Sequence, residues 1–185
     1  MMLYKNIRPI VALFAVTVLA ACSSQGSQQQ AQSQAEYELS TVSVEDLDIA
    51  TGQTIYIPAY SEINIGTRKT LDLAITLSIH NSDLNFPIVV NSVRYYDANG
   101  NLVQEYAEDA YVLGPMASTE FVIQREDQRG GVGANFIVEW ISEHTVSEPV
   151  AEAVMIGTGS QQGISFISPG RVCLLYTSPS PRDLR

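Results

Sequence analysis

Leu71-Asp72-Leu73-Ala74-Ile75-Thr76-Leu77-Ser78-Ile79 is the stretch that decides the fold. Large apolar side chains stand at every second position, and Asp, Ala, Thr and Ser fill the positions between them. A period of two places one face of an extended strand against a core and the other face toward solvent. A helix would spread the same apolar residues around its circumference. The stretch therefore predicts a half-buried β-strand over residues 71–79.

Turn signals divide the rest of the chain into further short strands. Residues 97–101, Asp-Ala-Asn-Gly-Asn, separate the runs 88–96 and 102–106, and an Asn-Gly pair between two such runs is a strong hairpin signal. The other candidate strands are residues 53–57, 119–125, 135–141, 150–156 and 163–167. About seven to nine short strands without an amphipathic helix predict an all-β fold, a single antiparallel β-sandwich that is Ig-like in outline. A small barrel is the alternative.

The N-terminus carries the features of an export signal. Lys5 and Arg8 precede an apolar run over residues 10–19, which is shorter than the roughly 20 residues that a membrane-spanning helix needs. Leu19-Ala20-Ala21-Cys22 then matches the lipobox of bacterial lipoproteins. We expect a signal peptide over residues 1–21 and lipidation at Cys22. An ordinary signal peptide with a chance cysteine, or an N-terminal helix, would be the alternatives.

Composition divides the remaining chain into linker, domain and tail. Residues 23–35 contain no charge and no large apolar side chain, so residues 22–51 are expected to form a lipid-anchored flexible linker. Within it, residues 36–50 could be a short strand, a helical turn or more linker. The β-sandwich domain is expected over residues 52–172. Residues 173–185 resemble translated sequencing adapter and are predicted to be foreign, a native Ser/Pro tail being the alternative.

The charge balance restricts the possible partners. The formal net charge is −10, and between Cys22 and Val172 six Lys and Arg stand against nineteen Asp and Glu. With no basic run, we expect no nucleic acid partner and no electrostatic adhesion to lipid headgroups. Membrane attachment should come through the N-terminal lipid. Ser23 follows the lipidated cysteine where inner-membrane lipoproteins can carry Asp, which favours an outer-membrane protein facing the periplasm in a Gram-negative cell.

The residues that usually carry chemistry form no recognisable cluster in the sequence. His80 and His144 lack zinc-ligand spacing, and no Gly-x-Ser-x-Gly motif occurs. Residues 97–101 begin like a calcium loop, but Leu102 occupies the sixth position, where such a loop needs glycine. We therefore predict no catalytic residue, no metal site and no cofactor. Four tyrosines near the hairpin are expected to pack across strands rather than to line a recognition surface: Tyr95, Tyr96, Tyr106 and Tyr111.

A glycine-rich loop is the one candidate for a ligand site. Its backbone N–H groups could cradle an anion beside two arginines, Arg125 and Arg129. However, it runs into the β-rich stretch Phe136-Ile137-Val138, whereas a phosphate loop would continue with a helix, so an inter-strand turn is favoured. The candidate residues are Asp127, Arg129, Gly130, Gly131, Gly133 and Asn135.

Six ordered blocks carry a resemblance to a known family: residues 55–61 (IYIPAYS), 78–81 (SIHN), 93–97 (VRYYD), 130–140 (GGVGANFIVEW), 153–158 (AVMIGT) and 161–166 (QQGISF). Over roughly residues 52–171 the chain resembles a bacterial lipoprotein family known as domain of unknown function 3124 (DUF3124). The resemblance implies an exported, often lipid-anchored domain, and it transfers no activity.

Together these observations predict a membrane-anchored exported lipoprotein. Its domain is expected to be a non-catalytic module of the cell envelope that binds a protein or another envelope component. An accessory subunit that adds a strand to a partner's sheet edge is one form of this. The alternative is a small-ligand-binding or enzymatic domain that uses the Arg129–Asn135 loop.

Overall fold

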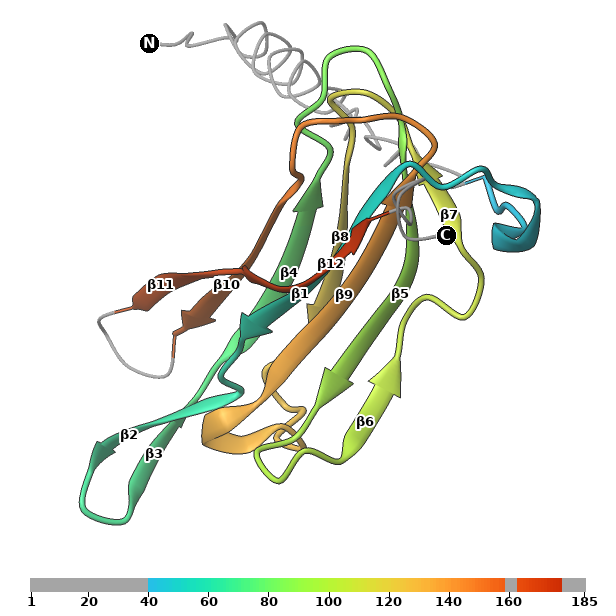
Figure 1. Cartoon of the computed structure of the whole chain (residues 1–185). Coiled ribbons are helices and arrows are strands. Elements are labelled where there is room, and N and C mark those ends of the chain that lie inside the picture. The colour runs from blue at the N-terminus through green and yellow to red at the C-terminus, as the bar shows by residue number, and fades with distance from the viewer. Residues whose placement is uncertain (1–39, 159–162, 178–185) are drawn as a thin grey trace, which may run out of the picture. The chain divides into compact units, whose positions relative to one another are not determined.

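The computed structural model describes residues 40–158 and 163–177 (Figure 1). Within these residues the chain forms only strands and two short 3₁₀ turns, and no helix is long and apolar enough to cross a membrane. The predicted signal peptide, Cys22 and most of the predicted linker lie outside the described residues. The elements are η1 Val44–Asp46, β1 Thr51–Pro58, β2 Glu62–Gly66, β3 Lys69–Asp72, β4 Ala74–His80, β5 Ile88–Tyr96, β6 Leu102–Glu105, β7 Tyr111–Leu113, β8 Ser118–Ile123, η2 Gly131–Gly133, β9 Asn135–Ser142, β10 Val150–Gly157, β11 Ile164–Pro169 and β12 Arg171–Thr177.

Two antiparallel sheets carry most of the strands. The large sheet has the order β12-β1-β9-β5-β6, with β7 also paired to β5. The small sheet has the order β11-β10-β4-β8, and β2 with β3 forms a separate hairpin. The hairpin projects at the lower left in Figure 1, at the opposite end from residues 40–50. The predicted all-β fold of packed antiparallel sheets is confirmed, and its Ig-like outline stays a prediction.

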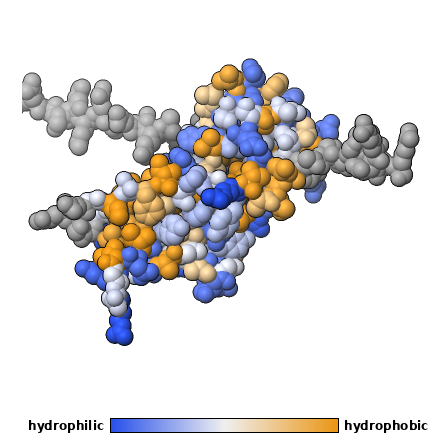
Figure 2. Space-filling model, turned by 60° about the vertical axis from the view of Figure 1, so that its left-hand side comes forward, coloured by the Kyte–Doolittle hydropathy of each residue, from blue (hydrophilic) through white to orange (hydrophobic). Residues whose placement is uncertain are grey.

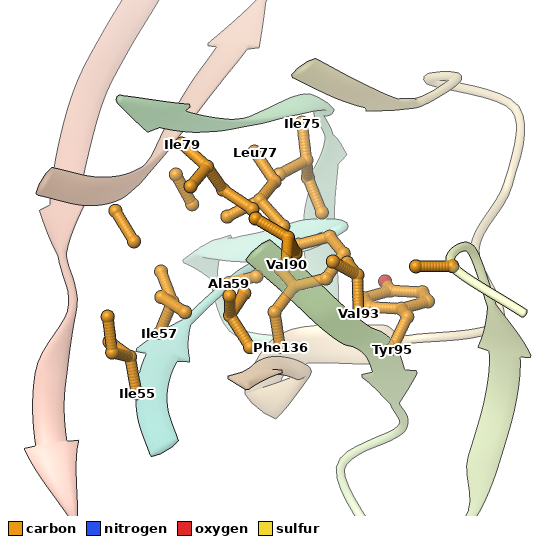
Figure 3. Close-up of a cluster of buried hydrophobic side chains, with 14 of the residues drawn as sticks. Ile55, Ile57, Ala59, Ile75, Leu77, Ile79, Val90, Val93, Tyr95 and Phe136 are labelled. Atoms are coloured by element: carbon orange, nitrogen blue, oxygen red, sulfur yellow. The ribbon is translucent and has the colours of Figure 1, made fainter. Parts of the chain in front are cut away.

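The core lies between the two sheets. Ile75, Leu77 and Ile79 of β4 are fully buried and point toward Val90, Val93 and Phe136 of the large sheet (Figure 3). These three β4 residues are the alternating apolar residues that predicted the strand, so the period-two pattern marks the core-facing side. Burying a large apolar side chain contributes about 1.5–3 kcal/mol, which makes this layer the main source of stability.

The predicted strand over residues 71–79 is interrupted at Leu73. β3 ends at Asp72 and pairs with β2, whereas β4 begins at Ala74 and pairs with β8 and β10. At the break, the Leu73 amide donates a hydrogen bond to the Ser61 carbonyl at 2.8 Å. One alternating stretch of sequence therefore contains two strands, which belong to two separate sheets. The alternation itself does not show where the strand partners change.

The predicted Asn-Gly hairpin is confirmed. β5 pairs with β6, and Gly100 adopts a positive φ of 81°, which glycine tolerates without steric cost. The Asp97 carboxylate accepts hydrogen bonds from the backbone N–H groups of Asn99 and Asn101, each at 2.8 Å. A hydrogen bond from the Asn101 side chain is the largest cause that holds the pKa of Asp97 below its usual value, and these backbone bonds add to it.

Residues 40–50, for which strand, helical turn and linker were left open, form a covering segment in the structure. This covering segment packs on the outer face of the large sheet, where Val42, Val44, Leu47 and Ile49 contact the buried residues Val89, Ala110 and Ile141. Its backbone is bonded too: the Val42 amide donates to Ala110 and the Ala50 amide to Ser142, both at 2.9 Å. The spaced apolar residues, from which the sequence predicted no single structure for residues 36–50, cover an apolar surface of the large sheet.

Near its C-terminus the chain passes directly from one sheet to the other. β11 continues through Gly170 into β12, so the chain crosses from the small sheet to the large one without a loop. A Cβ atom at Gly170 would lie 2.7 Å from the Ala151 carbonyl oxygen, so only glycine fits this crossing. Residues 173–177, predicted as tail, belong to β12 and pair with β1. The foreign origin of residues 173–185 stays a prediction.

Candidate functional site

The glycine loop closes one end of the sandwich. It connects β8 to β9 and forms the 3₁₀ turn η2, which lies against the hairpin turn after β5 and the chain after β1. The Gly130 carbonyl accepts the Ala98 amide at 3.1 Å, and the Gly131 carbonyl accepts the Ser61 amide and hydroxyl, each at 3.2 Å. The loop therefore ties together three segments that are distant in sequence.

Gly130 is required here because a tyrosine occupies the space that a side chain would need. A Cβ atom at this position would lie 1.8 Å from the Tyr95 hydroxyl oxygen and 2.7 Å from the Ala134 Cβ atom. Gly131 has a positive φ of 69° with only the Ala98 Cβ atom at 4.0 Å, and a Cβ at Gly133 would make an ordinary contact of 3.4 Å with the same atom. Gly130 is thus needed for close packing and Gly131 for its backbone conformation, whereas neither reason applies to Gly133.

The Tyr95 hydroxyl under the loop is buried and has no hydrogen-bond partner among the described residues. The Ser61 hydroxyl donates to the Gly131 carbonyl instead. Burial raises the pKa of Tyr95 to about 12, while Ser61 opposes the shift and the nearby Asp127 carboxylate adds to it. A phenol with this pKa stays protonated near neutral pH and is no general base there.

Arg129 and Asp127 form an ion pair with each other. The Arg129 Nε atom donates to Asp127 Oδ1 at 2.8 Å, and its Nη2 atom donates to Oδ2 at 2.6 Å. This two-point hydrogen bond holds the pKa of Asp127 below its usual range. The Arg129 side chain is 57% exposed, and its Nη2 atom also reaches Gln104 at 3.3 Å. The predicted anion-binding cation is therefore already paired with a carboxylate.

Asn135 lies at the first position of β9, between Pro58 of β1 and Tyr96 of β5. The structure thus places five of the six predicted loop residues in one turn, and Asn135 within the sheet. The arrangement is typical of a structural turn, because its carbonyls, its arginine and its tightest glycine all contact the protein itself.

The remaining candidates also have structural partners or lie at the surface. Tyr95 and Tyr106 stack near Phe136, with ring centroids 4.9 and 6.4 Å away, and Tyr111 packs near Phe121, so these three tyrosines pack in the interior as expected. His80 and His144 are exposed. In the part of the chain that the structure describes, no group of three or more His, Cys, Asp or Glu residues could hold a metal.

Sequence reasoning missed a shallow pocket on the outer face of the large sheet. It has a volume of about 200 Å³ beside the covering segment, and Val44, Ile49, Asn91 and Glu139 help to line it. Asn91 sits where the β5–β9 register shifts, and a register shift leaves no mark in the apolar pattern. Glu139 pairs with Arg94. The pocket is smaller than the roughly 300–1,000 Å³ of typical ligand sites, so we assign it no ligand.

Comparison with known families gives one result for this fold. Residues 52–173 match the family described as protein of unknown function, DUF3124. The chain belongs to this family. The match spans β1 to the start of β12, so the DUF3124 domain includes both sheets and the glycine loop. No curated protein and no solved structure matches the chain significantly.

Proposed function

We propose that this DUF3124 protein is an exported lipoprotein, anchored through a lipid on Cys22, whose sandwich is a non-catalytic binding or accessory module of the cell envelope. The observation that carries the anchor is the sequence Leu19-Ala20-Ala21-Cys22 directly after an apolar run of signal-peptide length. Small residues before the cysteine suit cleavage by a signal peptidase. In a Gram-negative cell, Ser23 favours the outer membrane, facing the periplasm.

The glycine loop supports binding by a surface rather than chemistry in a cleft. Its Gly130 and Gly131 carbonyls are bonded to Ala98 and Ser61, and Arg129 is bonded to Asp127. A small anionic ligand would have to break this ion pair before it could use the guanidinium. The loop therefore gives little support to the ligand-binding or enzymatic alternative.

The β2–β3 hairpin is the part of the domain best shaped for contact with an envelope partner. It projects from the sandwich (Figure 1), and its tip carries two adjacent exposed cations, Arg68 and Lys69. Ile65 beside them is 48% exposed. On a chain with a net charge of −10, these cations form a local positive site, which favours a partner that presents acidic groups.

Cysteine substitution tests the anchor. We expect the natural chain to be cleaved before Cys22 and to carry a diacylglycerol, measured by mass spectrometry of the protein purified from membranes. Cys22→Ser should remain an unprocessed precursor, and Cys173→Ser, the matched control, should be processed normally. A soluble, normally cleaved Cys22→Ser protein would contradict the lipoprotein proposal.

In-cell crosslinking with mass-spectrometric identification tests the partner. The anchored protein should recover a discrete envelope protein, and Lys69→Glu in the hairpin should reduce its yield. The matched control is Arg125→Glu, which makes the same charge change at an exposed position outside the hairpin. Equal recovery by both variants would contradict a role for the hairpin, and recovery of abundant bystanders only would contradict a binding module.

A further inference from the structure

β11 is an open edge of the small sheet. It pairs with β10 through six residue pairs in unbroken register, and no described strand pairs with its other side. An open strand presents unpaired N–H and C=O groups, and proteins usually protect such edges with charges, bulges or proline. Residues 164–168 of β11 carry no charge and no bulge, and the one proline of the strand is its last residue, Pro169.

The opposite edge of the same sheet is protected. β8 carries Glu120 at an exposed position in its middle, and a charged side chain there opposes pairing with another strand. The two edges of one sheet thus differ in the feature that decides whether a second chain can pair. Only β11 is suited to extend the sheet.

Apolar side chains continue across the outer face of the small sheet to this open edge. Val122, Thr76, Val154 and Ile167 are cross-strand neighbours that form one row over β8, β4, β10 and β11. At the two ends of the row, Val122 is 43% exposed and Ile167 is 57% exposed. Figure 2 shows apolar surface gathered on the side of the molecule that carries β10 and β11.

We propose that β11 pairs antiparallel with β11 of a second copy of this chain, which joins two small sheets into one continuous sheet. The open backbone groups require a strand as the occupant. Two copies that each carry a net charge of −10 repel at their charged faces, so β11, an uncharged strip, is the place where a second copy can approach. A two-fold axis brings like strips together and makes such an interface self-complementary.

The sequence of β11 permits this pairing in register. Directly opposite residues of an antiparallel pair project from the same face of the sheet. An axis at Ile167 sets that residue against the second copy's Ile167 and sets Phe166 against the second copy's Ser168. The apolar row then continues across the axis into the second copy without a change of face. This inference does not depend on the lipid anchor, so the two proposals can fail separately.

Photo-crosslinking in cells tests the pairing with the full chain. Two copies with different epitope tags are co-expressed with a photoreactive amino acid at position 167 or, as a matched control on the same face, at position 122. We expect copy-to-copy adducts from position 167 and none from position 122. Lack of copy-to-copy adducts at 167, adducts with a different protein there, or equal adducts at both positions would each overturn the proposal.

A charge on the edge provides the second arm. With the probe moved to position 164, Ile167→Lys should lower copy-to-copy crosslinking by about tenfold, and Val122→Lys should leave it unchanged. Reducing conditions exclude a disulfide through Cys173, which is exposed. Melting temperatures of both variants close to that of the natural chain would show that the loss is not unfolding. Undiminished crosslinking in the Ile167→Lys protein would overturn strand pairing.

Discussion

The outer faces of the two sheets are treated differently by the same chain. On the large sheet, the covering segment over residues 40–50 lies on Val89, Ala110 and Ile141, which are 7%, 8% and 7% exposed. On the small sheet, Ile156 is 47% exposed, and no described segment covers its face. Both faces carry β-branched apolar residues, so composition does not explain the contrast.

The contrast shows that the apolar outer face of the large sheet is buried, whereas that of the small sheet stays exposed. Apolar surface is stabilised by removal from water, whether the cover comes from the same chain or another. The large sheet obtains its cover from a segment just N-terminal to its own first strand. The small sheet ends in an open uncharged strand, where a second copy can supply further contacts. The following substitutions test this difference, from the largest expected effect to the smallest.

The substitution with the largest expected effect lies in the core between the two sheets. Phe136→Ala should lower the free energy of unfolding by about 3–5 kcal/mol, because it leaves a cavity in the core that both sheets line. Phe136 is fully buried and lies 4.9 Å from the Tyr95 ring. Urea unfolding measures the change. A loss below about 1 kcal/mol would contradict a single core common to both sheets.

A matched pair of isoleucines compares the two outer faces directly. Ile141→Ala should lower the free energy of unfolding by about 2 kcal/mol or more, because the covering segment buries this side chain. Ile156→Ala, on the bare face, should change stability by less than about 0.5 kcal/mol. Both values come from urea unfolding at low protein concentration. Equal losses would show that the two faces do not differ.

The glycine loop tests whether the end of the large sheet is closed by packing. Gly130→Ala should cost about 1–3 kcal/mol, because its Cβ atom would meet the Tyr95 hydroxyl. Gly133→Ala has room and should cost less than about 1 kcal/mol, and Tyr95→Phe should recover part of the Gly130→Ala loss. Thermal unfolding of the three variants measures this. Similar losses at both glycines would argue against close packing as the reason for Gly130.

Low pH should lower the stability of the domain, because it protonates the Asp83 carboxylate that bonds two connections between the sheets. The Asp83 carboxylate accepts the backbone N–H groups of Asn85, Phe86 and Ser147, at 2.8, 3.0 and 2.9 Å. It therefore ties the β4–β5 connection to the β9–β10 connection. The bond to Asn85, followed by those to Ser147 and Phe86, holds the pKa of Asp83 below its ordinary value of 3.8. Its contribution to stability is thus present above that value and lost as pH falls through the lower folded-state pKa.

Urea unfolding between about pH 6 and pH 2 measures this dependence. We expect the natural chain to lose stability at the acid end of the range. Asp83→Asn, which cannot titrate there, should lose less than the natural chain over the same interval. The same dependence of stability on pH in the two proteins would show that the Asp83 carboxylate does not stabilise the link between the two connections.

Local patterns predicted the elements of the fold well. The alternation over Leu71–Ile79 marked the core side of β4, and Asn99-Gly100 marked the β5–β6 turn, because both signals are contained within a few residues. The break at Leu73 could not be predicted, since it depends on a hydrogen bond to the distant Ser61. The sequence placed the glycine loop between two strands, where the structure has it, but the contact of Gly130 with Tyr95 depends on tertiary structure.

Long-range contacts also explain the structure of the segments before β1 and after β11. The apolar residues of 40–50 are spaced among acids, which left strand, helical turn and linker open. They become ordered only because Val89, Ala110 and Ile141 offer an apolar surface. At the other end, the change of composition after Val172 suggested a boundary, yet β12 pairs with β1. Strand propensity depends on the neighbouring strands, so a change of composition alone does not mark where a strand ends.

Hydrogen–deuterium exchange of the full chain at low and high protein concentration tests the central contrast most directly. The account predicts that amides of Ile164–Pro169 exchange more slowly as concentration rises, because a second copy pairs with this edge. Amides of Tyr111–Leu113, in the strand beside the covering segment, should exchange at the same rate at both concentrations. Exchange in β11 that does not change with concentration would contradict the account.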